Sequence, residues 1–261
     1  MTTNRRPLRR VLLAGAVLLS LTAVSCEPAA LNRWLVDHGR PQLREPELSK
    51  VAAALTAVEN EIARKASFVG RVESVDAARL GLSWRPGCPV APSDLRILTL
   101  SYWGIDGAGH TGELIVHRSI SLQMVVVFRE LWNAKFPIHQ MRTAEQFVDA
   151  SDFRPDGSFI ETDEPDHDDN TSAFFCRPAT GATSWSQHSY GLAVDINPVE
   201  NPYVKGGRMV PPNGLPGRDA ARPGTITASS LPVAAMKRAG MVWGGTWKSL
   251  KDYMHFSRNG H

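Results

Sequence analysis

The sequence predicts an α+β domain, in which a small antiparallel sheet is flanked by helices. Two stretches, 95–103 and 113–117, read as strands that bracket a glycine-rich turn. The following stretch, 119–135, carries apolar residues on one helical face and is closed by Pro137. With 43% hydrophobic and 21% charged residues, the chain has the composition of an ordinary globular protein.

The first 25 residues have the features of a secretory signal peptide. Four arginines lie between residues 5 and 10, and an apolar run of 14 residues follows from 11 to 24. A membrane-spanning helix needs about 20 residues, so this run is too short to span and fits an export signal. We therefore expect residues 1–25 to direct export.

The leader ends in Leu-Thr-Ala-Val-Ser-Cys, which is similar to a bacterial lipobox. In such a motif the cysteine, here Cys26, becomes the lipidated first residue of the mature protein. The residues 23–25 would also serve as an ordinary signal-peptidase site, so soluble secretion is the alternative. We expect a cell-envelope lipoprotein at the outer face of a bacterial membrane.

Residues 26–67 are expected to form a tether and an amphipathic helix. The stretch 27–42 is polar and contains two prolines, which suits a tether. From 47 to 66, apolar residues recur at steps of three and four, the period of an amphipathic helix. After the leader about 235 residues remain, enough for one domain and a linker, and we expect residues 68–261 to form that domain.

The charge of the chain argues against a nucleic-acid partner. The formal net charge of +3 includes the four leader arginines and falls to −1 without them. The sequence has neither a basic stripe nor an interleaved aromatic platform of the kind that binds nucleic acid. We expect a monomer.

Two segments supply metal-ligating residues. The first is Ser-Gln-His-Ser-Tyr-Gly-Leu-Ala-Val-Asp at 186–195, and the second is Asp-Tyr-Met-His at 252–255. A catalytic Zn²⁺ is held by three nitrogen or oxygen ligands and keeps a fourth position for water. His188, Asp195 and His255 could be those three ligands.

The spacing of these residues constrains the local structure. His188 and Asp195 are seven residues apart and would lie on opposite faces of a flat strand, so a turn must intervene, for which Tyr190-Gly191 is suited. A short strand at 192–196 would then deliver Asp195. The step of three from Asp252 to His255 suits one helical or tight turn, which would place the Asp252 carboxylate near the metal, where it could move a proton.

The two segments resemble the signature of the zinc D-alanyl-D-alanine carboxypeptidase and L-alanyl-D-glutamate endopeptidase family (peptidase family M15, VanY-like). The matching residues are Ser186, His188, Gly191, Ala193, Asp195, the tryptophan-rich run 243–247, Asp252, His255 and Phe256. The similarity covers about the last two thirds of the chain. It implies zinc bound by the two histidines and Asp195, Asp252 as general base, and a hedgehog/D-Ala-D-Ala peptidase-like fold with the zinc in a sheet-lined cleft.

The resemblance also implies an arginine upstream of the first ligand that binds a substrate carboxylate. Arg177 is the best candidate because a guanidinium can grip a carboxylate in a bidentate fork, and a structural ion pair or a surface charge is the alternative. Ser186 is a second candidate substrate residue, which could instead cap a turn. His110 could contact substrate or serve a structural purpose.

Of the three cysteines, one is explained by the lipobox and the other two can form a pair. Lipidation accounts for Cys26, which leaves Cys88 and Cys176 as an even pair. In an oxidising exterior these two would be expected to join, and two unpaired buried thiols are the alternative. A bridge would tie the start of the domain to the segment that carries Arg177.

Two long loops are predicted beside these segments. The acidic run 161–169 is expected to be a solvated loop, with a calcium site as the alternative. The stretch 205–224 contains four prolines and five glycines, so no regular element is expected there. Because it lies between the second and third zinc ligands, it is predicted to border the cleft and shape substrate choice.

The resulting expectation is an exported zinc metallopeptidase that hydrolyses peptidoglycan stem peptides. By resemblance, a D-alanyl-D-alanine carboxypeptidase is the first choice and an L-alanyl-D-glutamate endopeptidase is the alternative, because both substrates present a carboxylate near the bond. A metallo-amidase in a related fold is a further alternative. A non-catalytic zinc-containing cell-wall binding lipoprotein represents another class, which would lack a ligand or the base, and the sequence lacks neither.

Overall fold

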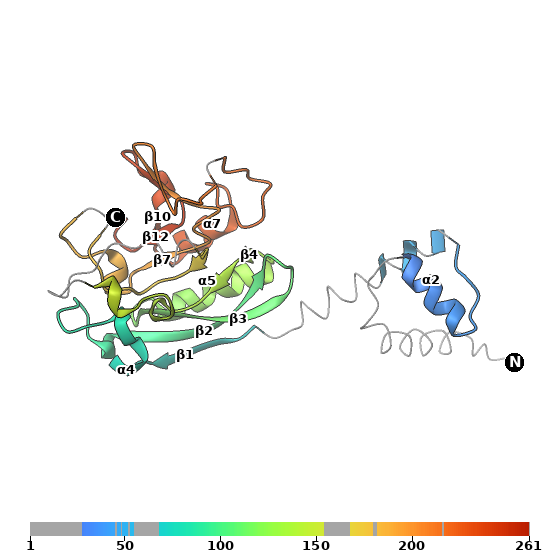
Figure 1. Cartoon of the computed structure of the whole chain (residues 1–261), viewed down its shortest axis with the longest axis horizontal. Helices are drawn as coiled ribbons and strands as arrows, with labels where there is room; N and C mark the ends of the chain where they lie inside the picture. Colours follow the sequence, from blue (N-terminus) through green and yellow to red (C-terminus); the bar gives the residue numbers. More distant parts are fainter. Residues whose placement is uncertain are drawn as a thin grey trace, which may run out of the picture. The chain divides into compact units, whose positions relative to one another are not determined.

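The computed structural model describes residues 28–44, 46–47, 49–51, 53–54, 68–153, 168–179, 182–215 and 217–260. The chain forms two compact units, Met1–Ser67 and Phe68–His261, and each is described by itself (Figure 1). The predicted signal peptide, Cys26 and most of the predicted helix 47–66 lie outside the described residues. Within the described ranges, no helix is both long and apolar enough to cross a membrane.

The first unit contains a helix that the sequence did not suggest. Helix α2 (Pro28–Asp37) occupies most of the polar stretch expected to be a tether. Pro28 suits its first position, where the missing N–H costs no hydrogen bond. The Asn32 side chain donates to the Leu43 carbonyl (3.0 Å) and accepts from the Leu43 N–H (2.9 Å), so the chain after α2 folds back along it.

The second unit is built on a four-stranded sheet. Strands β1 (Gly70–Ser74), β2 (Leu95–Gly104) and β3 (Gly109–His117) are antiparallel neighbours, and β4 (Pro137–Ile138) runs parallel to the end of β2. The two long strands confirm the predicted pair, and α5 (Ser121–Asn133) confirms the predicted helix with slightly shorter bounds. The α+β class is therefore confirmed.

The glycine-rich turn predicted between the long strands is wrong for most of its length. Gly109 and Gly112 lie inside β3, and only residues 105–108 connect the strands. A Cβ atom at Gly112 would lie 2.3 Å from the Met141 carbonyl oxygen, and one at Gly109 would lie 2.8 Å from the Trp132 ring. These glycines permit other parts of the chain to approach the strand closely.

The hydrophobic core joins the sheet to a layer of shorter elements. In Figure 1, α5 lies over one face of the sheet, and β7 (Ala193–Asp195), β10 (Val242–Trp243) and β12 (His255–Ser257) lie beyond it. Phe128 and Leu131 of α5 share one buried cluster with Val194 and Phe256 of the short strands. Hydrophobic packing on α5 thus supports the strands that carry the predicted metal ligands.

The shorter elements form small sheets of their own. β7, β12 and β10 make one antiparallel sheet, with β12 in the centre. A second antiparallel sheet contains, in spatial order, β11 (Lys251–Asp252), β8 (Tyr203–Lys205) and β9 (Arg208–Val210). Strands β5 (Gln140–Met141) and β6 (Asn170–Thr171) form a parallel pair. Short helices α4 (Ala77–Leu80) and α7 (Leu231–Arg238) complete the unit.

The prediction that 205–224 contains no regular element is wrong at its start. Strands β8 and β9 form a hairpin joined by Gly206 and Gly207, whose φ angles are 54° and 83°. A two-residue turn with both φ angles positive matches the twist of the flanking strands, and glycine adopts it at little cost. The signal in the sequence was the Gly-Gly pair between Tyr-Val-Lys and Arg-Met-Val.

The predicted disulfide is present. Cys88 and Cys176 are bonded, with their Cα atoms 5.9 Å apart. Cys176 is fully buried; its N–H donates to the Ser83 carbonyl (3.0 Å) and its carbonyl accepts from the Arg85 guanidinium (2.8 Å). The bond therefore fastens the segment around residues 83–88 to the residue that precedes Arg177.

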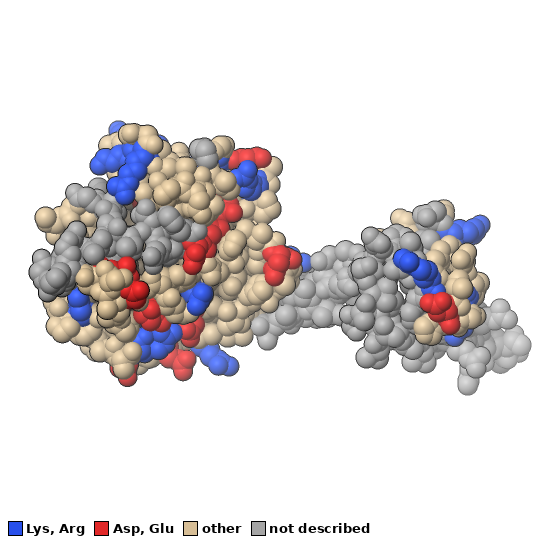
Figure 2. Space-filling model, in the orientation of Figure 1, with Lys and Arg blue, Asp and Glu red and all other residues tan. Residues whose placement is uncertain are grey.

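Charged side chains of both signs are interspersed over the face of the second unit shown in Figure 2. The unit's surface ion pairs include Arg118 with Asp94 at 3.2 Å, and exposed pairs of this kind contribute at most about 1 kcal/mol each. Most of the acidic run 161–169 lies outside the described residues, so its calcium alternative stays a prediction.

Replacing Gly191 by alanine is expected to lower the free energy of unfolding by about 3 kcal/mol. Gly191 has a φ of +65°, and an added Cβ would lie 2.6 Å from the His117 backbone nitrogen. Gly107→Ala is the matched control, because Gly107 has a φ of +75° but no atom within 4 Å of the added Cβ, and about 1 kcal/mol is expected. Urea denaturation measures both, and equal losses would contradict the steric argument.

Candidate metal centre

A short 3₁₀ helix and two paired strands bring the predicted ligands together. His188 lies in η5 (Gln187–Tyr190), which Gly191 ends in the left-handed conformation before β7 begins. The predicted turn and strand between His188 and Asp195 are therefore confirmed. Strand β12 pairs with β7 so that His255 lies directly opposite Asp195, although 60 residues separate them in the chain.

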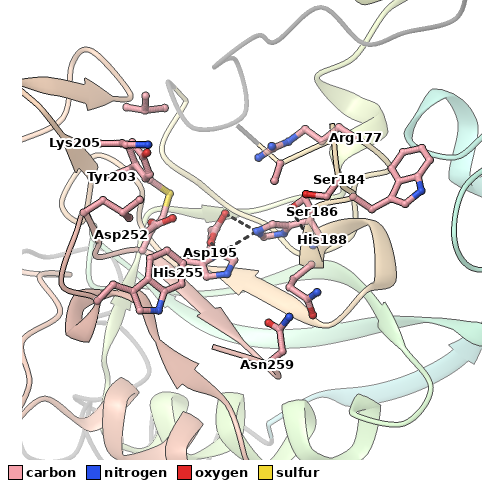
Figure 3. Close-up of a pocket in the computed structure, with 17 residues that line it drawn as sticks. Arg177, Ser184, Ser186, His188, Asp195, Tyr203, Lys205, Asp252, His255 and Asn259 are labelled. Atoms are coloured by element: carbon pink, nitrogen blue, oxygen red, sulfur yellow. Dashed lines mark hydrogen bonds and ion pairs between the residues drawn. The ribbon is translucent and has the colours of Figure 1, made fainter. Parts of the chain in front are cut away.

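The ligating atoms of the three residues converge in a buried cluster. His188 Nε2 lies 3.0 Å from Asp195 Oδ2, and His255 Nδ1 lies 2.9 Å from Asp195 Oδ1. The two imidazole nitrogens are 3.2 Å apart. Each residue is less than a tenth exposed, and the cluster could hold a metal ion (Figure 3).

The distances fit one small cation. Ligand atoms bound to a tetrahedral Zn²⁺ at about 2.0–2.1 Å lie about 3.3 Å from one another. The separations of 2.9–3.2 Å in the cluster are close to this value. Two histidines and one carboxylate are also ligand types that catalytic zinc uses. The donor set therefore fits a metal with an open fourth position.

Hydrogen bonding orients the two imidazoles. The Nδ1 atom of His188 contacts the Ala173 carbonyl oxygen, so Nδ1 carries the proton and donates it, which leaves the Nε2 lone pair directed at the cluster. His255 presents the other ring nitrogen, Nδ1, to the cluster. Within the described part of the chain, no hydrogen-bond partner reaches its buried Nε2 atom.

The Asp195 carboxylate is held in its charged form. Burial favours the neutral acid, but the charges and hydrogen bonds of His188 and His255 outweigh burial and hold the pKa of Asp195 well below its usual range. A bound dication would favour the same ionised form. The cluster thus presents a carboxylate and two imidazoles at the separations that one metal ion requires.

The cluster forms part of the wall of a pocket of about 370 Å³, which is a common size for a small-molecule site. Asp252, Arg177 and Ser186 line the same pocket, so the structure brings together every residue that the sequence predicted for metal binding, catalysis and substrate binding. The other lining residues come from several elements: Ala179, Ser184, Trp185, Gln187, Tyr203, Lys205, Val210, Trp247, Leu250, Met254 and Asn259.

Asp252 reaches the pocket from β11, and a bend at Tyr253 and Met254 separates it from His255. The step of three is therefore a tight turn and not a helical one. The Trp243 indole donates to the Tyr253 carbonyl at 2.8 Å, and the Arg218 guanidinium lies 3.3 Å from the centre of the Tyr253 ring. These contacts fix the turn that sets the separation between Asp252 and His255.

Arg177 is held by its backbone, while its side chain extends toward the pocket (Figure 3). Its N–H donates to the Ser189 hydroxyl oxygen at 2.9 Å, and that hydroxyl donates to the Arg177 carbonyl at 2.6 Å. Its guanidinium donates to the Pro178 carbonyl at 3.2 Å and forms no ion pair within the described ranges. The structural ion pair considered as an alternative is therefore not observed there.

The alternatives considered for Ser186 and for His110 have different outcomes. The Ser186 hydroxyl accepts a hydrogen bond from the His188 N–H at 3.3 Å and caps η5, so the capping alternative for Ser186 is confirmed. The contact of Ser186 with substrate stays a prediction. His110 pairs with Asp106 (2.9 Å), stacks on Tyr102 and does not line the pocket, which favours a structural purpose.

Sequence reasoning missed Tyr203, whereas Lys205 begins the stretch 205–224 that was predicted to border the cleft, and it does line the pocket. Tyr203 and Lys205 lie on β8, in a stretch for which no strand was expected. Trp247, from the tryptophan-rich run 243–247, also lines the pocket, with its ring 5.5 Å from that of His255. The Gly-Gly hairpin signal could have placed Tyr203 and Lys205 on a paired strand, but their position in the pocket depends on the pairing of β8 with β11.

The arrangement defines a candidate mononuclear metal site with a carboxylate beside it in a pocket, as in metal-dependent hydrolases. Residues 180–258 match the model of the M15 peptidase family that is described as D-alanyl-D-alanine carboxypeptidase. The resemblance is thereby confirmed for this segment, which contains all three candidate ligands and Asp252, and the match indicates a peptidoglycan-related metallopeptidase. No solved structure matches the chain significantly.

Proposed function

We propose that the protein is a zinc peptidase that cleaves peptidoglycan stem peptides and that its activity is that of a D-alanyl-D-alanine carboxypeptidase. The observation that carries this proposal is the convergence of His188, Asp195 and His255 in one pocket with Asp252 and Arg177. The family match over 180–258 supports the same chemistry. Export and anchoring through Cys26 complete the proposal and place the enzyme beside its substrate.

Five of the pocket residues have a defined task in this proposal. A zinc ion held by His188, Asp195 and His255 would polarise the scissile carbonyl and lower the pKa of water to about 7. Asp252 accepts the proton of the attacking water and passes it to the leaving amine. Arg177 binds the substrate carboxylate on the amine side of the bond and so orients the peptide.

An L-alanyl-D-glutamate endopeptidase is the second candidate function. Both substrates carry a carboxylate on the side of the leaving amine, so the Arg177 side chain in the pocket suits either one. The presence of Asp252 in the pocket argues against a non-catalytic cell-wall binding lipoprotein, which needs no proton acceptor beside a metal.

Incubation of the zinc-loaded protein with purified muropeptides, followed by mass analysis of the products, tests the proposal. Release of a single alanine is the expected result. An internal cut between L-alanine and D-glutamate would replace the carboxypeptidase with the endopeptidase, and separation of the peptide from muramic acid would indicate an amidase. Binding of muropeptides without cleavage by the metal-loaded protein would favour the binding lipoprotein.

A further inference from the structure

A second cationic side chain, Lys205, lines the pocket that holds the metal cluster. In Figure 3, Arg177 and Lys205 lie on opposite sides of the cluster formed by His188, Asp195 and His255, and both extend toward the space above it. A peptide whose scissile bond lies at the cluster would therefore pass one cation on each side of that bond.

The strand pairing fixes where Lys205 lies relative to Asp252. Strand β8 pairs with β11 so that Tyr203 lies opposite Asp252. Side chains alternate along a strand, so Tyr203 and Lys205 share the face of the sheet that carries Asp252. The Gly206-Gly207 turn begins directly after Lys205 and holds it at the end of a defined hairpin.

The Lys205 ammonium group is available to a ligand. Its residue is exposed, and in the described part of the chain it forms no ion pair. The Asp195 carboxylate of the same pocket is already held by two imidazoles. A carboxylate of the substrate is the natural partner for such a cation at a pocket wall.

We propose that Lys205 binds a carboxylate on the acyl side of the scissile bond, so that the preferred substrate is a peptide with a carboxylate on each side of the bond. This inference rests on the proposed function, in which Arg177 binds the carboxylate on the amine side. Lys205 is then a specificity residue, which lowers KM for acidic peptides and takes no part in proton transfer.

Two peptides that differ in one group test the proposal: one has a free carboxylate on the residue that precedes the acyl-side alanine, and the other has the amide there. Lys205→Gln is expected to raise KM about fivefold for the acid peptide, the effect of losing one exposed charge pair, with kcat unchanged. KM for the amide peptide should not change. Lys205→Arg should retain most of the preference.

Arg208→Gln is the matched control. Arg208 lies opposite Lys205 across the hairpin and is exposed, yet it does not line the pocket. Its loss removes the same charge from the same hairpin, so a KM change well below that of Lys205→Gln is expected. Equal effects of the two substitutions, or an equal effect of Lys205→Gln on both peptides, would overturn the proposal.

Calorimetric binding of both peptides to metal-loaded Asp252→Asn protein separates this inference from the proposed hydrolysis. Cleavage of both peptides without a Lys205-dependent preference would overturn the second carboxylate site and leave the peptidase in place. Tighter, Lys205-dependent binding of the acid peptide without cleavage by the unmodified protein would overturn the peptidase and support the site. Absence of both binding and cleavage would overturn both.

Discussion

Replacing Asp252 by asparagine is expected to lower kcat for stem-peptide cleavage by about a thousandfold, within the range that general acid–base catalysis supplies. Asparagine has nearly the same size and can occupy the same place in the pocket, but its amide cannot accept the proton of the attacking water. Metal content should remain at one equivalent, because Asp252 lies outside the cluster of three ligands.

Steady-state kinetics together with elemental analysis of the same samples would measure this effect. Glu73→Gln is the matched control, since it makes the same change of carboxylate to amide on an exposed position of β1. That variant should keep full activity. An Asp252→Asn protein with full metal content and unchanged kcat would remove Asp252 from the proposed mechanism.

Removal of the metal is expected to have an effect of similar size. Treatment with a chelator should abolish peptide cleavage, and added Zn²⁺ should restore it. At a free zinc concentration a thousand times its Kd, binding should also add about 4 kcal/mol to the free energy of unfolding. The physical reason is that the three ligands converge only in the folded protein, so bound zinc stabilises that state over the unfolded chain.

His255→Ala tests the same point within the protein. It removes one of three ligands, and bound zinc should fall well below one equivalent. His110→Ala is the control, because His110 is exposed and pairs with Asp106 away from the pocket. Elemental analysis and thermal unfolding with and without zinc measure both variants. One full equivalent of zinc in the His255→Ala protein would contradict the proposed ligand set.

Much of the fold could be predicted from local patterns. The apolar period of 119–135 indicated α5, and the two strand-like stretches indicated β2 and β3, because these elements contribute most of their apolar side chains to the buried core. Within the second unit, the errors arose at glycines. Gly109 and Gly112 were taken for a turn because glycine is common there, whereas contacts with Trp132 and Met141 from distant segments require them inside β3.

The chemistry of the candidate site could be predicted from the sequence, but only some of the residues that line it could. His188, Asp195, Asp252 and His255 lie in two short segments whose spacing indicated a metal site, and all four line one pocket. Lys205 belongs to neither segment. It reaches the pocket because β8 pairs with β11, a contact between strands about fifty residues apart, which no local pattern specifies.

The sequence by itself determined the ligand types, the turn at Gly191 that separates His188 from Asp195, and the cysteines available for a disulfide. These follow from side-chain chemistry and local backbone stereochemistry. Only the tertiary structure decided that His255 lies opposite Asp195, that the Ala173 carbonyl orients His188, and that Arg177 and Lys205 face the pocket from opposite sides. Those features depend on packing and strand pairing between distant segments, because a side chain's neighbours are set by the whole core.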